Sequence, residues 1–234
     1  MMMIKVKVVK CLLDISLKHF VEKIASLTDF GPQDNYCTLV EYSDSSLSAV
    51  YVEKVVARET IIDIHGNETE IDVVRYPRYE FQIQHFGKEG EYLLLIFNPP
   101  RSLKALVNFL TLELSNKIYF REMKLSIENF VSRASLFEEF SHFTVDKVRA
   151  KGVQVSGSSY ADVSISSTAD AYKDIESFLD RKSYKVSNIR MRVKTKYGHG
   201  KVEVSSAGLL GVDQNVFDEV LDFFFSSAKD IVIY

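Results

Sequence analysis

Runs of β-branched and aromatic residues alternate with short turn sequences between Tyr36 and Phe97, and this pattern constrains the fold more than any other feature. The turns are rich in Gly, Ser, Asp and Asn, which tolerate the backbone angles of tight reversals. Connections this short join antiparallel neighbours, so the segment predicts an antiparallel meander. The turn sequences are Ser43-Asp44-Ser45, His65-Gly66-Asn67 and Gly87-Lys88-Glu89-Gly90.

Helices and further strands are expected on both sides of the meander. Alternation in residues 4–8 predicts a strand, and Asp14 is expected to cap a helix that stops at the loop Asp29-Phe30-Gly31-Pro32. Asn98-Pro99-Pro100 then predicts the start of a second helix, followed by a strand over 117–124. Residues 1–133 are therefore expected to form a β-rich antiparallel α+β domain.

The next segment, residues 134–158, is expected to connect two domains. Ser135 and Glu138 have capping-box spacing, which predicts a helix over residues 136–150. The sequence Gly157-Ser158-Ser159 is typical of a linker, so we place a domain boundary there.

Residues 159–234 predict a ferredoxin-like βαββαβ domain, with two helices covering one face of a four-stranded antiparallel sheet. The fold class is therefore α+β, and this fold hosts many unrelated functions. The expected strands are 161–166, 184–196, 201–206 and 230–234, and the expected helices are 170–180 and 213–226.

The order hairpin, helix, strand occurs twice, in residues 79–120 and in residues 189–234. One interpretation is an elaborated duplication, in which the first half carries an inserted hairpin set between Tyr36 and Val74. The other interpretation is chance, because this order of elements is common.

Composition narrows the class of protein without identifying a function. The chain has 234 residues, of which 46% are hydrophobic and 26% charged, as in ordinary globular proteins. A net charge of -3 gives no global attraction to nucleic acid or to an anionic membrane. The apolar runs are shorter than the ~20 residues that cross a bilayer, and Cys11 and Cys37 are too few for a disulfide framework. We expect a cytoplasmic protein with free buried thiols and no membrane partner.

A local excess of positive charge lies between Arg181 and Lys201, where eight basic residues occur without Asp or Glu. Residues two apart on a strand share a face, so a row of cations is expected opposite the buried Ile189, Met191 and Val193. One interpretation is structural, because lysines protect strand edges and Asp162 or Glu203 could neutralise the row. The other is a partner-binding site made of Arg190, Arg192, Lys194, Lys196, Tyr197 and Lys201.

The leading functional hypothesis is a non-catalytic binding or accessory module whose basic sheet face engages a protein or nucleic acid through residues 190–196. Neighbouring strands offer serines where an RNA-reading sheet would present aromatic rings, which leaves Tyr197 as the stacking candidate. The five histidines and two cysteines lack metal-ligand spacing, so we expect no metal and no cofactor.

A nuclease is the second hypothesis. His199, in a glycine-containing turn among cations, is a candidate acid or base. Asp72 followed by Glu80-Phe81-Gln82 loosely resembles the Asp…Glu-x-Lys arrangement of PD-(D/E)xK nucleases, which implies Mg²⁺ held by carboxylates on adjacent strands. Gln82 stands where that family has lysine.

A self-associating structural subunit is the third hypothesis. It rests on Phe223, Phe224 and Phe225, because three successive aromatic side chains cannot all face one core.

Overall fold

The structure is a computed structural model that describes residues 2–26, 35–179 and 183–233. It is a mixed α/β fold with a large antiparallel sheet and, among the described residues, five α-helices. The chain divides into two compact units: Lys10–Phe120, called the first unit, and Met1–Val9 with Arg121–Tyr234, called the second unit. The expected loop at residues 29–32 and the cations Arg181 and Lys182 lie outside the described residues. None of the described helices is long and apolar enough to span a membrane.

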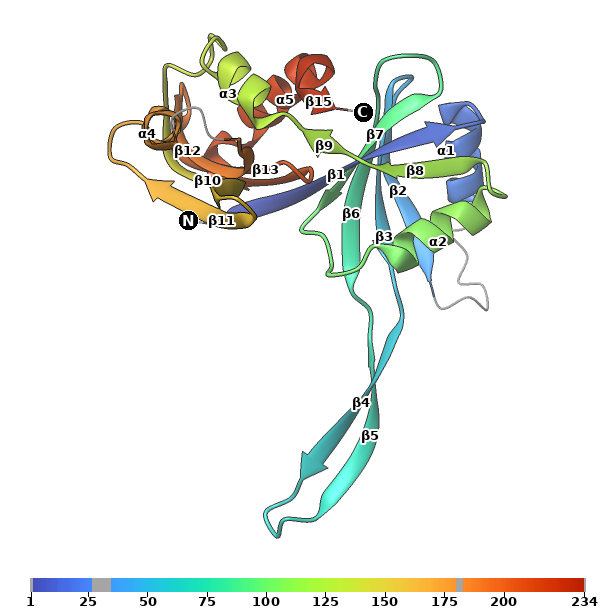
Figure 1. The fold of residues 1–234 in the computed structure, drawn as a ribbon. Coiled ribbons are helices and arrows are strands. Elements are labelled where there is room, and N and C mark those ends of the chain that lie inside the picture. The colour runs from blue at the N-terminus through green and yellow to red at the C-terminus, as the bar shows by residue number, and fades with distance from the viewer. Residues whose placement is uncertain (1, 27–34, 180–182, 234) are drawn as a thin grey trace. The chain divides into compact units, whose positions relative to one another are not determined.

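The first unit contains the predicted antiparallel meander. Its strands lie in the order β8-β1-β7-β6-β3-β2, and β1 also contributes its first residues to the second unit. Figure 1 shows α1 and α2 beside this sheet. The elements are β1 (Met3–Leu13), α1 (Leu17–Ala25), β2 (Tyr36–Tyr42), β3 (Ser46–Val52), β6 (Arg78–His85), β7 (Glu91–Phe97), α2 (Lys104–Glu113) and β8 (Ile118–Glu122).

The core of the first unit lies between the sheet and its helices. Phe20 and Ile24 of α1 are completely buried, and the Tyr51 ring of β3 packs 5.0 Å from the ring of Phe109 on α2. The cap of α1 is Ser16, whose hydroxyl accepts a hydrogen bond from the backbone N–H of His19 at 3.2 Å. The expectation that Asp14 caps this helix is therefore wrong, because Ser16 has the extended backbone and the reach of the N-cap.

A hairpin separates β3 from β6 in the chain. Its strands, β4 (Val55–Ile62) and β5 (Glu68–Arg75), pair with each other and form a two-stranded sheet of their own. Figure 1 shows a long ribbon continuing from β3 and β6, and in the described part of the chain no helix covers it. Asp63 closes its turn by accepting hydrogen bonds from the backbone N–H groups of His65 and Asn67.

The second unit contains a sheet with strand order β11-β10-β12-β13-β14-β1, in which neighbouring strands pair antiparallel. A separate two-stranded sheet joins β15 to β9. The elements are β9 (Lys124–Leu125), α3 (Ile127–Ala134), β10 (His142–Ser156), β11 (Ser159–Ser166), α4 (Ala171–Leu179), β12 (Lys185–Thr195), β13 (Gly198–Ser205), β14 (Leu209–Asp213), the 3₁₀ turn η1 (Gln214–Val216), α5 (Phe217–Ile231) and β15 (Val232–Ile233).

The helix predicted over residues 136–150 is wrong. Residues 142–156 form β10, a 15-residue strand, and Ser135 ends α3 instead of starting a helix. The strand is favoured because β10 pairs with a neighbouring strand on each side and buries Val145, Val148 and Ala150 on the covered face of the sheet. The local sequence does not reveal this environment. Gly157 lies in the turn between β10 and β11, so the compact units do not separate there.

The ferredoxin-like arrangement expected for residues 159–234 is not observed. Strand β10 lies between β11 and β12 and pairs with both, whereas the expected four-stranded sheet contains no strand from residues 142–156. The helix α5 continues to Ile231, and the short β15 after it pairs with β9 outside the main sheet. The individual strands and helices otherwise fall close to their expected positions, with β14 as an additional strand.

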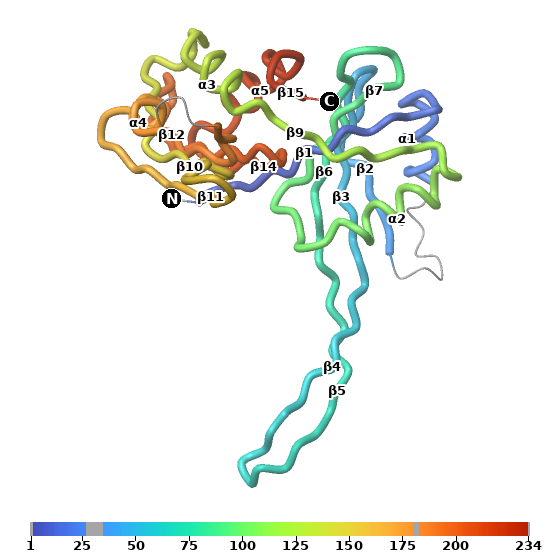
Figure 2. The backbone as a smooth tube through the Cα atoms, in the orientation of Figure 1, coloured from blue at the N-terminus to red at the C-terminus, as the bar shows by residue number. Residues whose placement is uncertain are grey.

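The two units share an order of elements, which can be followed along the chain in Figure 2. Four successive antiparallel strands, β2-β3-β6-β7 in one and β10-β12-β13-β14 in the other, precede α2 and α5. In each unit a first strand and a last strand also pair, β1 with β8 and β9 with β15. In this shared order the hairpin β6–β7 corresponds to β13–β14. The sequence comparison of residues 79–120 with residues 189–234 matches it to β12–β13 instead, one strand earlier. The hairpin β4–β5 and the pair β11–α4 are the additions to this shared order.

Candidate binding face of the second unit

The sheet of the second unit has a covered face and an open face. Ile189, Met191 and Val193 of β12 are buried on the covered face, where α3 contacts β12, α4 contacts β10 and α5 contacts β14. Phe130 of α3 and Phe223 of α5 pack with ring centroids 5.1 Å apart in this core. The side chains of β12 that alternate with the buried ones lie on the open face.

Three of the predicted cations lie on this open face in the predicted row. Arg190 is half-buried, while Arg192 and Lys194 are exposed. Lys201 joins them from β13, where its Cα lies opposite that of Arg192. The Asp213 carboxylate holds this part of β13 by accepting a hydrogen bond of 2.9 Å from the backbone N–H of Lys201.

Lys196 and Tyr197 lie in the turn after the row. Strand β12 ends at Thr195, so Lys196 does not continue the row, and its ammonium nitrogen lies 4.8 Å from the centroid of the Tyr197 ring. Both side chains are exposed. The structure therefore places these two predicted residues at the margin of the face.

Strand β10 adds cations that the sequence pattern did not reveal. Lys147 lies opposite Arg190 in the pairing of β10 with β12, and Arg149 lies opposite Asn188. Both side chains are exposed on the open face. Their alternation with the buried Val148 and Ala150 was the available signal, and the expectation of a helix at residues 136–150 concealed it. We call Lys147, Arg149, Arg190, Arg192, Lys194 and Lys201 the basic face.

Asp146 holds the two arginines of the row. A register shift between Val145 and Lys147 makes Asp146 the extra residue of a β-bulge, which redirects side chains locally. The Arg190 Nε donates a hydrogen bond of 2.8 Å to Asp146 Oδ1, and the Arg192 Nε lies 3.7 Å from Oδ2. The hydrogen bond to Asp146 raises the pKa of the Arg190 guanidinium above its ordinary value, and this effect outweighs the opposing effect of burial. The Asp146 side chain is only 13% exposed, so this network is partly shielded from solvent.

The two acids expected to neutralise the row differ in what they contact. Asp162 of β11 accepts a hydrogen bond of 3.1 Å from Arg149 instead of contacting β12. Glu203 lies opposite Arg190 on β13 and adds to the electrostatic stabilisation of that arginine. Within the described residues, the three lysines of the basic face form no ion pair, so their charges face solvent. The lysines are Lys147, Lys194 and Lys201.

A shallow hollow of about 230 Å³ opens in the basic face. Lys147, Arg149 and Arg190 line it together with Asn188 and Glu203. The lining therefore offers hydrogen-bond donors from the cations and the amide, and acceptors from the amide and the carboxylate.

The residues proposed for a nuclease are not brought together. Asp72 lies in the hairpin sheet and contacts Arg58 at 3.5 Å, whereas Glu80 lies on β6 opposite Val50 of β3. The adjacent-strand arrangement implied by the PD-(D/E)xK resemblance is therefore not formed. His199 is exposed on β13 opposite Lys194. Among the described residues, no three His, Cys, Asp or Glu side chains form a group suited to a metal ion.

The three successive phenylalanines of α5 differ in burial. Phe223 and Phe224 are completely buried, and Phe225 is half-buried with its ring 6.1 Å from that of Phe224. The core of the second unit thus accommodates two of the three rings, and we base no self-association on this sequence.

No protein-family description matches the sequence, and none of the curated proteins is significantly similar to it. Solved structures that match include the crystal structure of DynU16, a protein in the dynemicin biosynthetic locus. DynU16 has 9% sequence identity over 95% of this chain and 94% of that chain, with a TM-score of 0.19. A TM-score this low supports no conclusion on fold or function, so function is argued from the chain itself.

Proposed function

We propose that this chain is a binding module whose basic face engages an acidic protein surface. The observation that carries the proposal is the presence, on the open side of a sheet, of three lysines that form no ion pair within the described residues: Lys147, Lys194 and Lys201. Asp146 holds Arg190 and Arg192 beside them in fixed positions. Positioned cations steer an oppositely charged partner and fix its orientation.

The acids within the face favour a protein partner over nucleic acid. Asp146 and Glu203 lie among the cations, and Asp162 lies beside Arg149. These carboxylates would repel a continuous line of phosphates, whereas a protein surface of mixed charge can pair with both signs. Single-stranded nucleic acid is typically held on aromatic platforms. The exposed rings of Tyr160, near the start of β11, and of Tyr197, in the turn after β12, lie outside the row.

The test is capture of partners from the native host by the full chain and by a variant with Lys147, Lys194 and Lys201 all changed to Ser. A matched control changes Lys18, Lys23 and Lys104, exposed lysines of the first unit, to Ser. We expect captured proteins to be lost with the Ser variant of the face and kept with the control variant, before and after nuclease treatment. Equal capture by all three chains would refute the proposal, and capture that nuclease abolishes would replace the protein partner with nucleic acid.

A further inference from the structure

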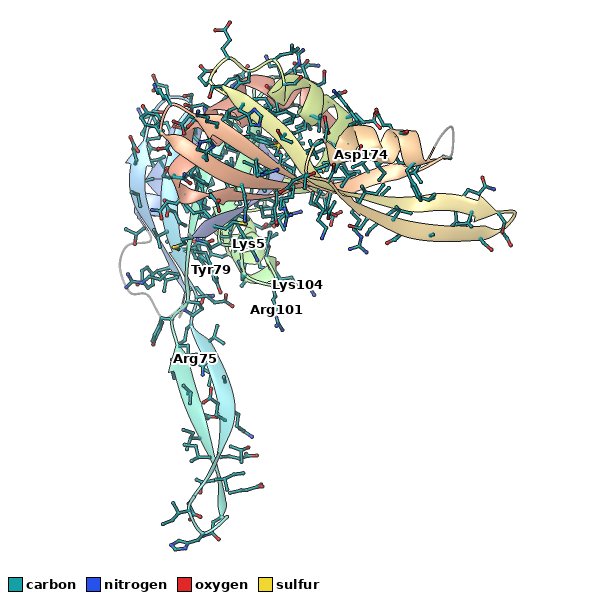
Figure 3. The ribbon with its side chains drawn as sticks, turned by 90° about the vertical axis from the view of Figure 1, so that its left-hand side faces the viewer. Lys5, Arg75, Tyr79, Arg101, Lys104 and Asp174 are labelled. Atoms are coloured by element: carbon teal, nitrogen blue, oxygen red, sulfur yellow. The ribbon has the colours of Figure 1, made fainter. Side chains whose placement is uncertain are left out.

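The hairpin β4–β5 carries charge of the opposite sign to the basic face. Between Val55 and Arg75 the chain has five acidic and two basic residues, a net charge of -3 that equals that of the whole chain. The hairpin is exposed on both faces and pairs only with itself among the described strands. Figure 3 shows its side chains projecting from both strands, with Arg75 labelled near its base.

Three of these acids form a row on one face of β5. Glu68, Glu70 and Asp72 are two residues apart, so they share a face. The contacts of Arg58 confirm this, because its guanidinium lies 3.5 Å from both Glu70 and Asp72 across the hairpin. Side chains of Glu70 and Asp72 are 65% and 62% exposed, so these pairs leave the carboxylates accessible. We call Glu68, Glu70 and Asp72 the acidic row.

The acidic row and the row on β12 have the same repeat. Residues two apart on any strand are about 6.6–6.8 Å apart, and this applies equally to Glu68, Glu70 and Asp72 and to Arg190, Arg192 and Lys194. Two such rows laid face to face bring each carboxylate near a cation without adjustment of either strand. Opposite charges in matching positions favour association and fix its register.

Exposed apolar side chains flank the acidic row on the same face. Val56 and Val74 lie opposite each other at the base of the hairpin and are 56% and 46% exposed, and Ile62, opposite Glu68, is 63% exposed. The two valines adjoin each other, whereas Ile62 is separated from them by the positions of Arg58 and Thr60 on the same face. The valines and Ile62 supply apolar area that charge pairing alone would lack.

We propose that the acidic row of one copy of this chain docks on the basic face of a second copy. This inference rests on the proposed function, because it names the acidic partner of the same face. Each copy carries one row and one face, so docking either closes reciprocally into a dimer or continues from copy to copy.

The test uses two charge-reversed variants of the full chain. The row variant changes Glu68, Glu70 and Asp72 to Lys. The face variant changes Lys147, Lys194 and Lys201 to Glu, which leaves the Asp146 network in place. Sedimentation equilibrium of the unaltered chain should give a mass that rises with concentration above 26.7 kDa and falls back to it in high salt. Each variant alone should remain at 26.7 kDa and melt at nearly the temperature of the unaltered chain.

A mixture of the two variants is the critical sample, because it restores opposite charges. The basic row of one variant can dock on the acidic face of the other, and the acidic row of the second can dock on the basic face of the first. We expect the mixture to regain the concentration-dependent mass of the unaltered chain. An unaltered chain that stays monomeric, or a mixture that does not reassociate, overturns the inference. The proposed function stands in that case if the Ser variant of the face still loses partners in the capture experiment, and it fails separately if that variant loses none.

Discussion

Replacing Asp146 with Asn should destabilise the second unit more than any other single carboxylate-to-amide change on the open face. The Asp146 carboxylate accepts the Arg190 hydrogen bond at 2.8 Å and lies 3.7 Å from Arg192, and the Asn amide keeps the shape while it loses the charge. Arg190 would then donate to a neutral oxygen, and the two arginines and Lys147 would repel one another without a central anion.

The size of the effect follows from the two contacts. A hydrogen bond to a charged group contributes about 1.5–3 kcal/mol and one between neutral groups about 0.5–1.5 kcal/mol, so the first contact loses roughly 1 kcal/mol. The ion pair with Arg192, whose side chain is 52% exposed, adds about 0.2–1 kcal/mol. The free energy of unfolding should fall by about 1–2 kcal/mol, which corresponds to roughly 2–8 °C in Tm for a chain of this size.

Thermal unfolding at pH 7 measures this, with Asp162→Asn as the matched control. Asp162 also pairs with one arginine, but both side chains are about half exposed, at 48% and 52%, so its loss should cost about 0–1 kcal/mol. Equal shifts in Tm for the two variants, or an unchanged Tm for Asp146→Asn, would refute the view that Asp146 holds the arginines in place.

Three further predictions concern the first unit. The Tyr51 hydroxyl is buried without a hydrogen-bond partner among the described residues, so Tyr51→Phe should raise stability by about 1 kcal/mol in denaturant unfolding, and a loss would contradict this. Burial raises the pKa of the Cys11 and Cys37 thiols to about 12. Both thiols should therefore resist a thiol reagent at pH 8 until the chain is unfolded, and rapid reaction of either thiol in the folded chain would contradict its burial. Hydrogen bonds, first from the Asn67 side chain, lower the pKa of Asp63. The hairpin turn should therefore stay ordered at every pH above about 3.9, the ordinary pKa of an aspartate, and lose its order only as the pH falls through the lowered pKa of Asp63. An NMR titration of the Asn67 amide with a midpoint at or above about 3.9 would contradict this.

Local patterns in the sequence were sufficient for the meander and for the orientation of β12. Alternation of apolar and polar residues acts within one strand, so Arg192 and Lys194 could be placed on the open face without reference to the neighbouring strands. The turns at Gly66 and Gly87 could be predicted for the same reason, and both glycines adopt positive φ angles, 82° and 81°.

The strand β10 is hard to recognise from its own sequence because a bulge near its start alters its periodicity, and only residues 147–150 keep a clear alternation. The extra residue Asp146 separates the buried Val145 from the buried Val148 by three positions, which is a helical spacing. The capping-box pattern of Ser135 and Glu138 reinforced that interpretation. Hydrogen bonds to β11 and β12 decide in favour of the strand, and these partners lie later in the chain.

The strand order of the second unit depends on contacts that no window of sequence contains. Residues Met3 to Lys7 pair with Leu209 to Asp213, near the opposite end of the chain. Leu125 pairs with Val232, which is also distant in the sequence. Both pairings exclude the four-stranded plan expected for residues 159–234.

Lysine footprinting can detect a partner on the basic face directly, because it works without an identified partner. The purified chain, at a concentration where it is monomeric, and the same chain in native host lysate would be acetylated briefly, and the modification of each lysine quantified by mass spectrometry. We expect Lys147, Lys194 and Lys201 to become protected in the lysate, while the exposed Lys18 and Lys104 of the first unit react equally in both samples. Equal reactivity of the three basic-face lysines in both samples would contradict the claim that this face binds a partner.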